Sequence, residues 1–342
     1  MPTHRYNITS WISITLTDSI FIQDYLARNS PYYYVIQIMY VAEVATFLST
    51  FIFVPFMLLS FIRCDSLHPN IRILLSCFSI IVTINATSRS TILLYQLQYI
   101  PVKDELVHDL PLVIAYVGHI FHIFSTFTII SMSPIERGFA SYYINDYESN
   151  TKIHVGIVIC AVGICEGLIC AAVFLAGQEL LMIPLILLCV QLFIALILDI
   201  FVYLWNLRRI KKLNFDVKPG EDINYTLGIK YQVIENLHYF RFQRHLLIYC
   251  TPPVTFCCFL FFELSDDPVS TVFTLVLVDL IDEASLLGFF LVCLYSLKEV
   301  RICFFALFGW RHKIMRNVLT IDGAQRAEQT ASYFQQLNQA WK

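Results

Sequence analysis

The residues from Leu110 to Glu148 read LPLVIAYVGHIFHIFSTFTIISMSPIERGFASYYINDYE. The first part, Leu110–Met132, is apolar apart from a few hydroxyl groups and two histidines, and it is long enough to cross a bilayer as a helix. An acidic and a basic residue, Glu136 and Arg137, follow almost at once. This stretch therefore combines a membrane span with a paired acid and arginine at its end.

The composition of the whole chain indicates a multi-pass membrane protein. Of the 342 residues, 57% are hydrophobic and 14% are charged, and the mean hydropathy is +0.65. An ordinary soluble domain has about 25% charged residues, so most of this chain is expected to lie in lipid. The cysteines and histidines show no spacing typical of a zinc site, and we expect neither a metal nor a cofactor.

Seven apolar stretches predict seven transmembrane helices. They are Val35–Ile62, Ile73–Gln96, Leu110–Met132, Val155–Ala176, Leu180–Trp205, His245–Phe262 and Val269–Leu294. The sixth stretch is short, and the helical spacing of apolar residues from Leu227 onward predicts that its helix begins earlier. Pro252 and Pro253 predict a kink in the same helix, because proline removes a backbone hydrogen bond.

The distribution of basic residues predicts the orientation. The connections after the first, third and fifth spans, together with the tail, hold 19 Lys and Arg, whereas the N-terminal segment and the other connections hold 3. Basic residues favour the cytoplasmic side. We therefore predict an all-α membrane protein with a seven-helix bundle like that of G-protein-coupled receptors. Its parts are an extracellular N-terminus (1–32), a transmembrane domain (33–294) and a cytoplasmic tail (295–342) with a short amphipathic helix.

Glu136 and Arg137 lie where the third predicted span reaches the cytoplasm. Such a pair is typical of G-protein-coupled receptors, in which it holds the resting bundle closed and the arginine is released when the helices move apart. The alternative is that Arg137 only anchors the helix end at the membrane surface. An adjacent acid adds nothing to an anchor, so we interpret the pair as a switch.

The sequence that follows resembles one receptor family. Residues Glu136–Glu148 are similar to the ER..A.....DYE signature of the nematode serpentine receptor class epsilon (Sre) family. Four further stretches also resemble that family: Asn214–Asp216, Tyr225–Leu227, Tyr231–Asn236 and Tyr333–Trp341. The resemblance implies a seven-transmembrane chemoreceptor of sensory neurons, located in the plasma or ciliary membrane. It implies a small-molecule ligand and a heterotrimeric G protein as partners, and it does not identify the ligand.

Arg89 is the one basic residue within the predicted spans. At ~1.5 Å per residue from the outer boundaries, Arg89 lies about 10 Å deep, Glu43 about 12 Å and Asp279 about 15 Å. An unpaired arginine there costs roughly 2.5–3.5 kcal/mol, so we expect these three residues to form one layer. The layer is either a structural ion pair or a site that also meets an acidic or carbonyl-bearing ligand from outside.

Four further residues are candidates for a ligand site or a modification. His119 and His122 share one face of the third helix, where they either contact a ligand or are satisfied within the bundle; two such residues do not make a metal site. Asn7 begins the sequon Asn-Ile-Thr in the outer segment, so we expect it to be glycosylated. Cys303 lies just beyond the last span, where it either carries palmitate or packs on an apolar face.

Other classes of protein fit the sequence less well. A transporter with seven spans would be expected to show internal repeats, and none is visible. A ligand-gated ion channel of the insect chemoreceptor type has its N-terminus inside, against the basic-residue distribution. Enzyme motifs such as a phosphate-binding glycine loop are absent, and we expect neither catalysis nor a nucleic-acid partner. We therefore predict a chemosensory G-protein-coupled receptor, with a channel or transporter as the alternative.

Overall fold

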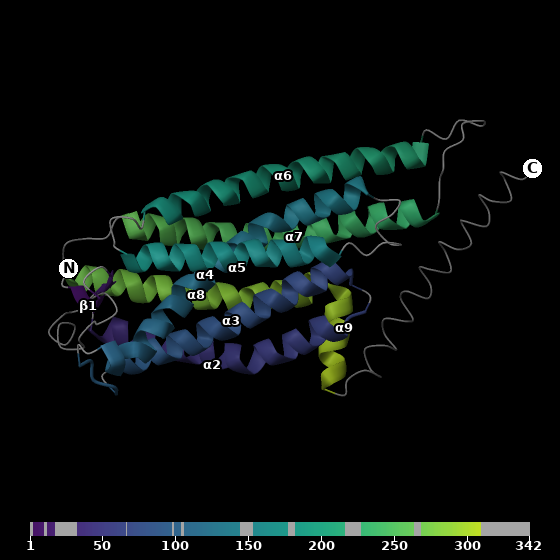
Figure 1. Cartoon of the computed structure of the whole chain (residues 1–342). Helices are drawn as coiled ribbons and strands as arrows, with labels where there is room; N and C mark the ends of the chain where they lie inside the picture. Colours follow the sequence, from purple (N-terminus) through teal and green to yellow (C-terminus); the bar gives the residue numbers. More distant parts are fainter. Residues whose placement is uncertain are drawn as a thin grey trace, which may run out of the picture.

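The computed structural model describes residues 3–9, 12–17, 33–65, 67–97, 99–103, 106–143, 153–176, 182–215, 227–262 and 268–308. Within these residues, seven long helices form a bundle with a short hairpin at one end and a short helix at the other (Figure 1). The long helices are α2 (Tyr33–Arg63), α3 (Pro69–Gln96), α4 (Leu106–Tyr142), α5 (Ile153–Ala176), α6 (Met182–Phe215), α7 (Leu227–Phe262) and α8 (Pro268–Ser296). The hairpin consists of β1 (Thr3–Thr9) and β2 (Ile12–Thr17), and the short helix is α9 (Lys298–Leu307).

Every apolar stretch predicted from the sequence overlaps one long helix, but three helices extend well beyond the apolar run. α4 continues past Met132 to Tyr142, so the acid–arginine pair lies within a helix. α6 continues to Phe215. α7 begins at Leu227, which confirms the early start predicted from the spacing of its apolar residues. Polar helical turns thus extend the bundle beyond its apolar part.

Five helices in the described part of the chain are long and apolar enough to cross a membrane. They lie at Tyr33–Arg63, Pro69–Gln96, Val107–Tyr142, Ile153–Val173 and Ile183–Lys211.

The hairpin is an addition to the predicted all-α fold. Ile12, Ile14 and Leu16 alternate with Ser and Thr along β2, and this period of two favours a strand.

The helices pack side by side in one bundle, and α4 is the helix that contacts most of the others. α2 packs against α3 and α8, and α7 packs against α6 and α8. α4 contacts α3, α5, α6 and α7, so it lies at the centre of the bundle. The hairpin contacts α4 and α5, and α9 packs against α2 and α8. Because α4 touches most of the other helices, its side chains are placed to connect them.

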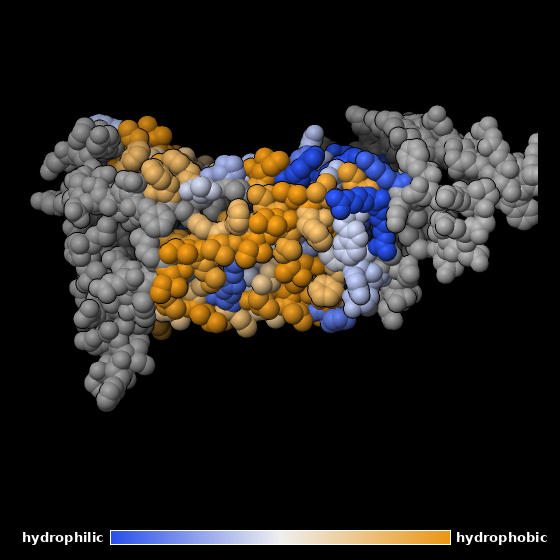
Figure 2. Space-filling model, turned by 90° about the horizontal axis from the view of Figure 1, so that it is seen from above, coloured by the Kyte–Doolittle hydropathy of each residue, from blue (hydrophilic) through white to orange (hydrophobic). Residues whose placement is uncertain are grey.

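The outer surface is apolar and the interior contains charge. Ile52, Phe193 and Ile248 are 68%, 64% and 64% exposed, whereas Glu43 and Arg89 are buried. Apolar side chains cover the middle of the face shown in Figure 2, and hydrophilic side chains gather toward one end. A soluble protein would bury its apolar residues and expose its charges. This reversed arrangement fits a bundle surrounded by lipid.

α5 approaches α4 closely at two glycines. A Cβ atom on Gly167 would lie 1.9 Å from the Ser125 hydroxyl oxygen and 2.8 Å from the Phe121 carbonyl oxygen. A Cβ atom on Gly163 would lie 2.7 Å from Cγ1 of Ile129. The two helices therefore meet almost backbone to backbone, as small residues allow in membrane bundles.

Candidate functional site

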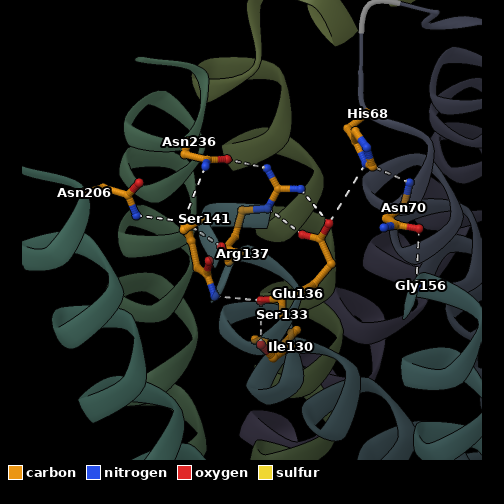
Figure 3. Close-up of polar contacts among 11 residues, drawn as sticks. His68, Asn70, Ile130, Ser133, Glu136, Arg137, Ser141, Gly156, Asn206 and Asn236 are labelled. Atoms are coloured by element: carbon orange, nitrogen blue, oxygen red, sulfur yellow. Dashed lines mark hydrogen bonds and ion pairs between the residues drawn. The ribbon is translucent and has the colours of Figure 1, made fainter. Parts of the chain in front are cut away.

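Arg137 lies at the centre of a buried polar cluster near the end of α4 (Figure 3). Its Nε and one terminal nitrogen donate to the two carboxylate oxygens of Glu136, at 2.5 and 2.6 Å. Its other terminal nitrogen donates to Oδ1 of Asn236 on α7, at 3.1 Å. The guanidinium also lies 4.6 Å from the centroid of the Tyr239 ring. The pair on α4 is therefore attached to α7 through the arginine.

Ser141 extends this cluster to α6. Its hydroxyl oxygen accepts hydrogen bonds from Asn206 of α6 at 2.8 Å and from Asn236 of α7 at 3.3 Å. The same hydroxyl donates to the backbone carbonyl of Arg137 at 2.8 Å. Arg209 donates to the backbone carbonyl of Ser141 at 2.7 Å. The cluster thus ties three helices together next to a guanidinium that is only 2% exposed.

Two further contacts border the cluster. Gln243 of α7 donates to the Ser133 hydroxyl at 2.7 Å, and Ser133 donates to the carbonyl of Ile130 at 2.8 Å. On the other side, Nδ1 of His68 lies 4.0 Å from a carboxylate oxygen of Glu136. His68 also caps the start of α3 by accepting a hydrogen bond from the Asn70 amide. Glu136 therefore lies between Arg137 and the first turn of α3.

A second buried cluster surrounds Arg89 of α3. Its Nε donates to Oε1 of Glu43 on α2 at 2.9 Å, and a terminal nitrogen contacts the same oxygen. That terminal nitrogen also lies 2.9 Å from Oδ2 of Asp279 on α8. Arg89 is 3% exposed and Glu43 is fully buried. The structure thus brings these three residues, which the depth argument selected, into direct contact.

His119 joins this second cluster from α4. Its Nδ1 lies 2.9 Å from Oδ1 of Asn85, and its Nε2 lies 3.5 Å from Oδ1 of Asp279. Asn85 in turn donates to Oε1 of Glu283 at 2.8 Å. Four helices therefore contribute to one layer of four charged residues, one amide and one imidazole. We name the six residues of this layer the outer cluster: Glu43, Asn85, Arg89, His119, Asp279 and Glu283.

His122 lies about one turn from His119 and faces a different acid. Its Nδ1 is 3.7 Å from Oδ2 of Asp282, and its side chain is completely buried. Within the described residues, neither ring nitrogen of His122 makes a hydrogen bond, and Oδ2 of Asp282 and the hydroxyl of Thr126 also lack one. Buried polar atoms are normally satisfied, so these atoms are available to a bound molecule or to water.

Asp282 and Thr126 line a cavity of about 70 Å³ between α3, α4, α6, α7 and α8. Most of the remaining wall is apolar, with aromatic rings from Phe78, Phe127 and Phe289. A few hydrogen-bonding groups in an otherwise apolar wall are typical of small-molecule sites. The cavity thus suits a small apolar compound, or the end of a larger one, that carries a polar group.

The other candidate residues lie at the two ends of the bundle. Asn7 is on β1, opposite Ser13 of β2, at the end away from α9 (Figure 1). Cys303 is half-buried on α9, the helix that packs Phe304 against Phe53 with ring centroids 5.1 Å apart. Among the described residues, no group of three or more His, Cys, Asp and Glu is placed to hold a metal. Segments 144–148 and 333–341, part of the family resemblance, lie outside the described residues.

The amide and hydroxyl residues in and beside the Arg137 cluster were not predicted from the sequence. These are Ser133, Ser141, Asn206, Asn236 and Gln243. Asn236 and Gln243 are seven residues apart and share a helix face with Tyr239, so polar residues at helical spacing in an extended α7 would have been the signal.

A bundle of long apolar helices with buried charge clusters defines the class of this protein: it is a multi-pass helical membrane protein. The family model described as Sre G protein-coupled chemoreceptor matches residues 6–342, nearly the whole chain. The chain belongs to this family, which confirms the resemblance, and it is a chemosensory G-protein-coupled receptor. The family is a class of receptors rather than enzymes. A comparison with individual curated proteins gave no match.

Proposed function

We propose that all seven long helices cross the membrane, with the N-terminus (1–32) outside and the tail (295–342) in the cytoplasm. The distribution of Lys and Arg, 19 against 3, supports this orientation. The placement of the hairpin and α9 at opposite ends of the bundle agrees with it (Figure 1). A heterotrimeric G protein then binds at the end that carries Glu136 and Arg137. Membership of a chemoreceptor family supports a location in the plasma or ciliary membrane of sensory neurons.

The Arg137 cluster consists of Glu136, Arg137, Ser141, Asn206 and Asn236, and its contacts carry this proposal. They hold α4, α6 and α7 together in the resting state, and we call this cluster the lock. Arg137 holds α7 through Asn236, while Ser141 holds both α6 and α7. A hydrogen bond to a charged group contributes about 1.5–3 kcal/mol, which is comparable with the few kcal/mol that separate resting and active states. Outward movement of α6 and α7 breaks these contacts and frees Arg137 for the G protein.

The ligand acts at the other end of the same central helix. The outer cluster and the cavity beside His122 and Asp282 form the ligand-binding region, which a small molecule reaches from outside. His119 and Arg137 are both on α4, and at ~1.5 Å per residue they are roughly 27 Å apart along the helix. α8 carries Asp279 and Asp282, and it packs on α7, which carries Asn236. A ligand that moves α4 or α8 therefore biases the lock.

Two substitutions test the lock in cells that report cyclic nucleotide or calcium. Arg137→Ala is expected to reduce both basal signalling and responses to a panel of volatile and water-soluble compounds. Glu136→Gln is expected to raise basal signalling several-fold, because an amide holds the guanidinium less strongly than a carboxylate does. Both effects are expected at a surface level close to that of the unmodified receptor.

Arg72→Ala is the matched control, because Arg72 pairs only with the exposed Asp65 among the described residues. An exposed ion pair contributes about 0–1 kcal/mol, so its loss should leave signalling unchanged. Unchanged signalling in both Arg137→Ala and Glu136→Gln, at matched surface expression, would show that the pair only anchors the helix end.

A further inference from the structure

A groove lies on the outer face of the bundle between α6 and α7. It has a volume of about 460 Å³, within the range of about 300–1,000 Å³ for ligand pockets. Its apolar part is lined by Leu196, Ile200, Leu247, Ile248 and Pro252, and Asp199, Arg241 and Arg244 also line it. α6 and α7 pack against one another along this side of the bundle (Figure 1).

Arg241 and Arg244 are both exposed in this groove, and the carboxylate of Asp199 is close enough to Arg244 to attract its charge. Within the described part of the chain, neither guanidinium donates a hydrogen bond or forms an ion pair. The two residues come directly before the apolar run His245–Phe262, so in the proposed orientation they lie where the cytoplasmic headgroups meet the acyl chains. At this depth the guanidinium groups are within reach of the lipid phosphates, and anionic headgroups attract basic side chains.

The groove is charged at one end and apolar along the rest. At ~1.5 Å per residue, Arg241 and Pro252 are roughly 16 Å apart along α7, and the lining residues between Arg244 and Pro252 are the aliphatic Leu247 and Ile248. A guanidinium binds phosphate through paired hydrogen bonds, and the apolar part of the groove suits an acyl chain. The cytoplasmic leaflet is the one rich in anionic lipid.

From this arrangement we propose that the groove between α6 and α7 binds one anionic phospholipid of the cytoplasmic leaflet. Arg241 and Arg244 hold the headgroup phosphate, and an acyl chain follows Leu247 and Ile248 toward Pro252. The leaflet assignment rests on the orientation given under the proposed function. The binding itself does not depend on the Arg137 lock.

A substitution at Asp199 tests whether the bound ligand is an anion or a cation. Its carboxylate is buried in the groove, and its Oδ1 has no hydrogen-bond partner among the described residues. A carboxylate opposes a second anion nearby, so removing its charge should strengthen the binding of an anionic lipid. It should weaken the binding of a cationic ligand.

A lipid in this groove also contacts α6 and α7, the two helices that the lock connects to α4. Asn206 of α6 and Asn236 of α7 both donate to Ser141, and each lies a few residues from a groove residue. A lipid seated between α6 and α7 is therefore expected to change how readily the helices separate.

The experiment measures lipid binding to the full-length receptor in detergent by native mass spectrometry. Phosphatidylserine and phosphatidylcholine with identical acyl chains are titrated separately. The unmodified receptor is expected to bind phosphatidylserine in preference. The double variant Arg241→Ala/Arg244→Ala should bind it about tenfold more weakly or worse, because each basic residue near the membrane surface adds to anionic-lipid binding. Asp199→Asn should bind it more tightly.

The control is Arg208→Ala/Lys211→Ala, which removes two exposed basic residues near the C-terminal end of α6 that do not line the groove. This variant should still bind phosphatidylserine in preference to phosphatidylcholine. Ile200→Trp, which fills the groove, should weaken phosphatidylserine binding without changing any charge. Equal binding of the two lipids, or a double variant that matches the control, would overturn the proposal. Displacement by soluble glycerophosphoserine alone would also overturn it, since the site would then be a headgroup-only anion site. No signalling is measured, so failure of the lock leaves this result unaffected.

Discussion

The guanidinium of Arg89 lies in the apolar part of the bundle, where lipid cannot compensate its charge. Two carboxylates from neighbouring helices, α2 and α8, compensate it instead. Glu43 and Asp279 both contact it, and His119 lies 3.5 Å from Asp279. Removing one partner of a buried ion pair costs about 3–5 kcal/mol, because the remaining charge is stranded. The outer cluster therefore constrains how α2, α3 and α8 pack as well as what a ligand can meet.

Arg89→Ala is expected to lower surface expression several-fold, because it strands Glu43 and Asp279. Adding Glu43→Gln or Asp279→Asn should partly restore expression by removing a stranded acid. Flow cytometry of an extracellular tag measures this directly. Arg72→Ala is the control, and it should have little effect because Arg72 pairs with an exposed acid. If neither double variant exceeds Arg89→Ala alone, Arg89 depends on a different partner.

Asn236 accepts a hydrogen bond from Arg137 with a neutral amide oxygen. Substitutions at Asn236 can therefore either weaken or strengthen the contact between Arg137 and α7. Asn236→Ala removes the acceptor for Arg137 and one donor to Ser141, and basal signalling should rise several-fold. Asn236→Asp places a carboxylate opposite the guanidinium and should lower basal signalling, since charge-assisted hydrogen bonds are roughly twice as strong as neutral ones. Changes in the same direction for both variants, measured at equal surface expression, would contradict the lock.

At the scale of elements, α5 packs closely on α4 because two of its residues are glycines without a side chain. Gly163 and Gly167 leave room for Ile129 and Ser125 across an antiparallel contact. In lipid no hydrophobic force drives helices together, so close packing of this kind supplies much of the association. α5 also makes polar contacts with its neighbours: the Gly156 amide donates to Asn70 of α3 at 3.3 Å, and Gln191 of α6 donates to Glu166.

Gly167→Val is expected to separate α5 from α4 and to reduce the amount of folded receptor strongly. The clash involves the Phe121 backbone carbonyl, 2.8 Å from the added Cβ, and a backbone cannot give way as a side chain can. Gly138→Ala is the matched control, because its Cβ would meet Val202 at 3.8 Å, an ordinary contact. Thermal unfolding of the purified receptor compares the two. Equal stability would show that α5 packs differently.

The helices were predictable from sequence because lipid requires long apolar runs, and that requirement is local. The contacts of Arg89 were largely predictable too, since charges are rare in spans and depth limits their partners. The other members of the Arg137 cluster were not predictable, because Asn206, Asn236 and Ser141 carry no charge and their contacts depend on how α6 and α7 extend past the apolar runs. Which helix neighbours which is likewise a property of packing rather than of local sequence.

For the whole molecule, the sharpest test is which end of the bundle faces outward. The sequence holds three sequons, at Asn7, Asn85 and Asn224. Asn85 is buried and bonded to Glu283, Asn7 lies on β1 at the end opposite α9, and Asn224 lies outside the described residues. In the proposed orientation only Asn7 meets the glycosylation machinery, so Asn7→Gln should abolish the glycan-dependent shift on a gel. Asn224→Gln should leave the shift intact, and a glycan at Asn224 would place the connection before α7 outside and reverse the orientation.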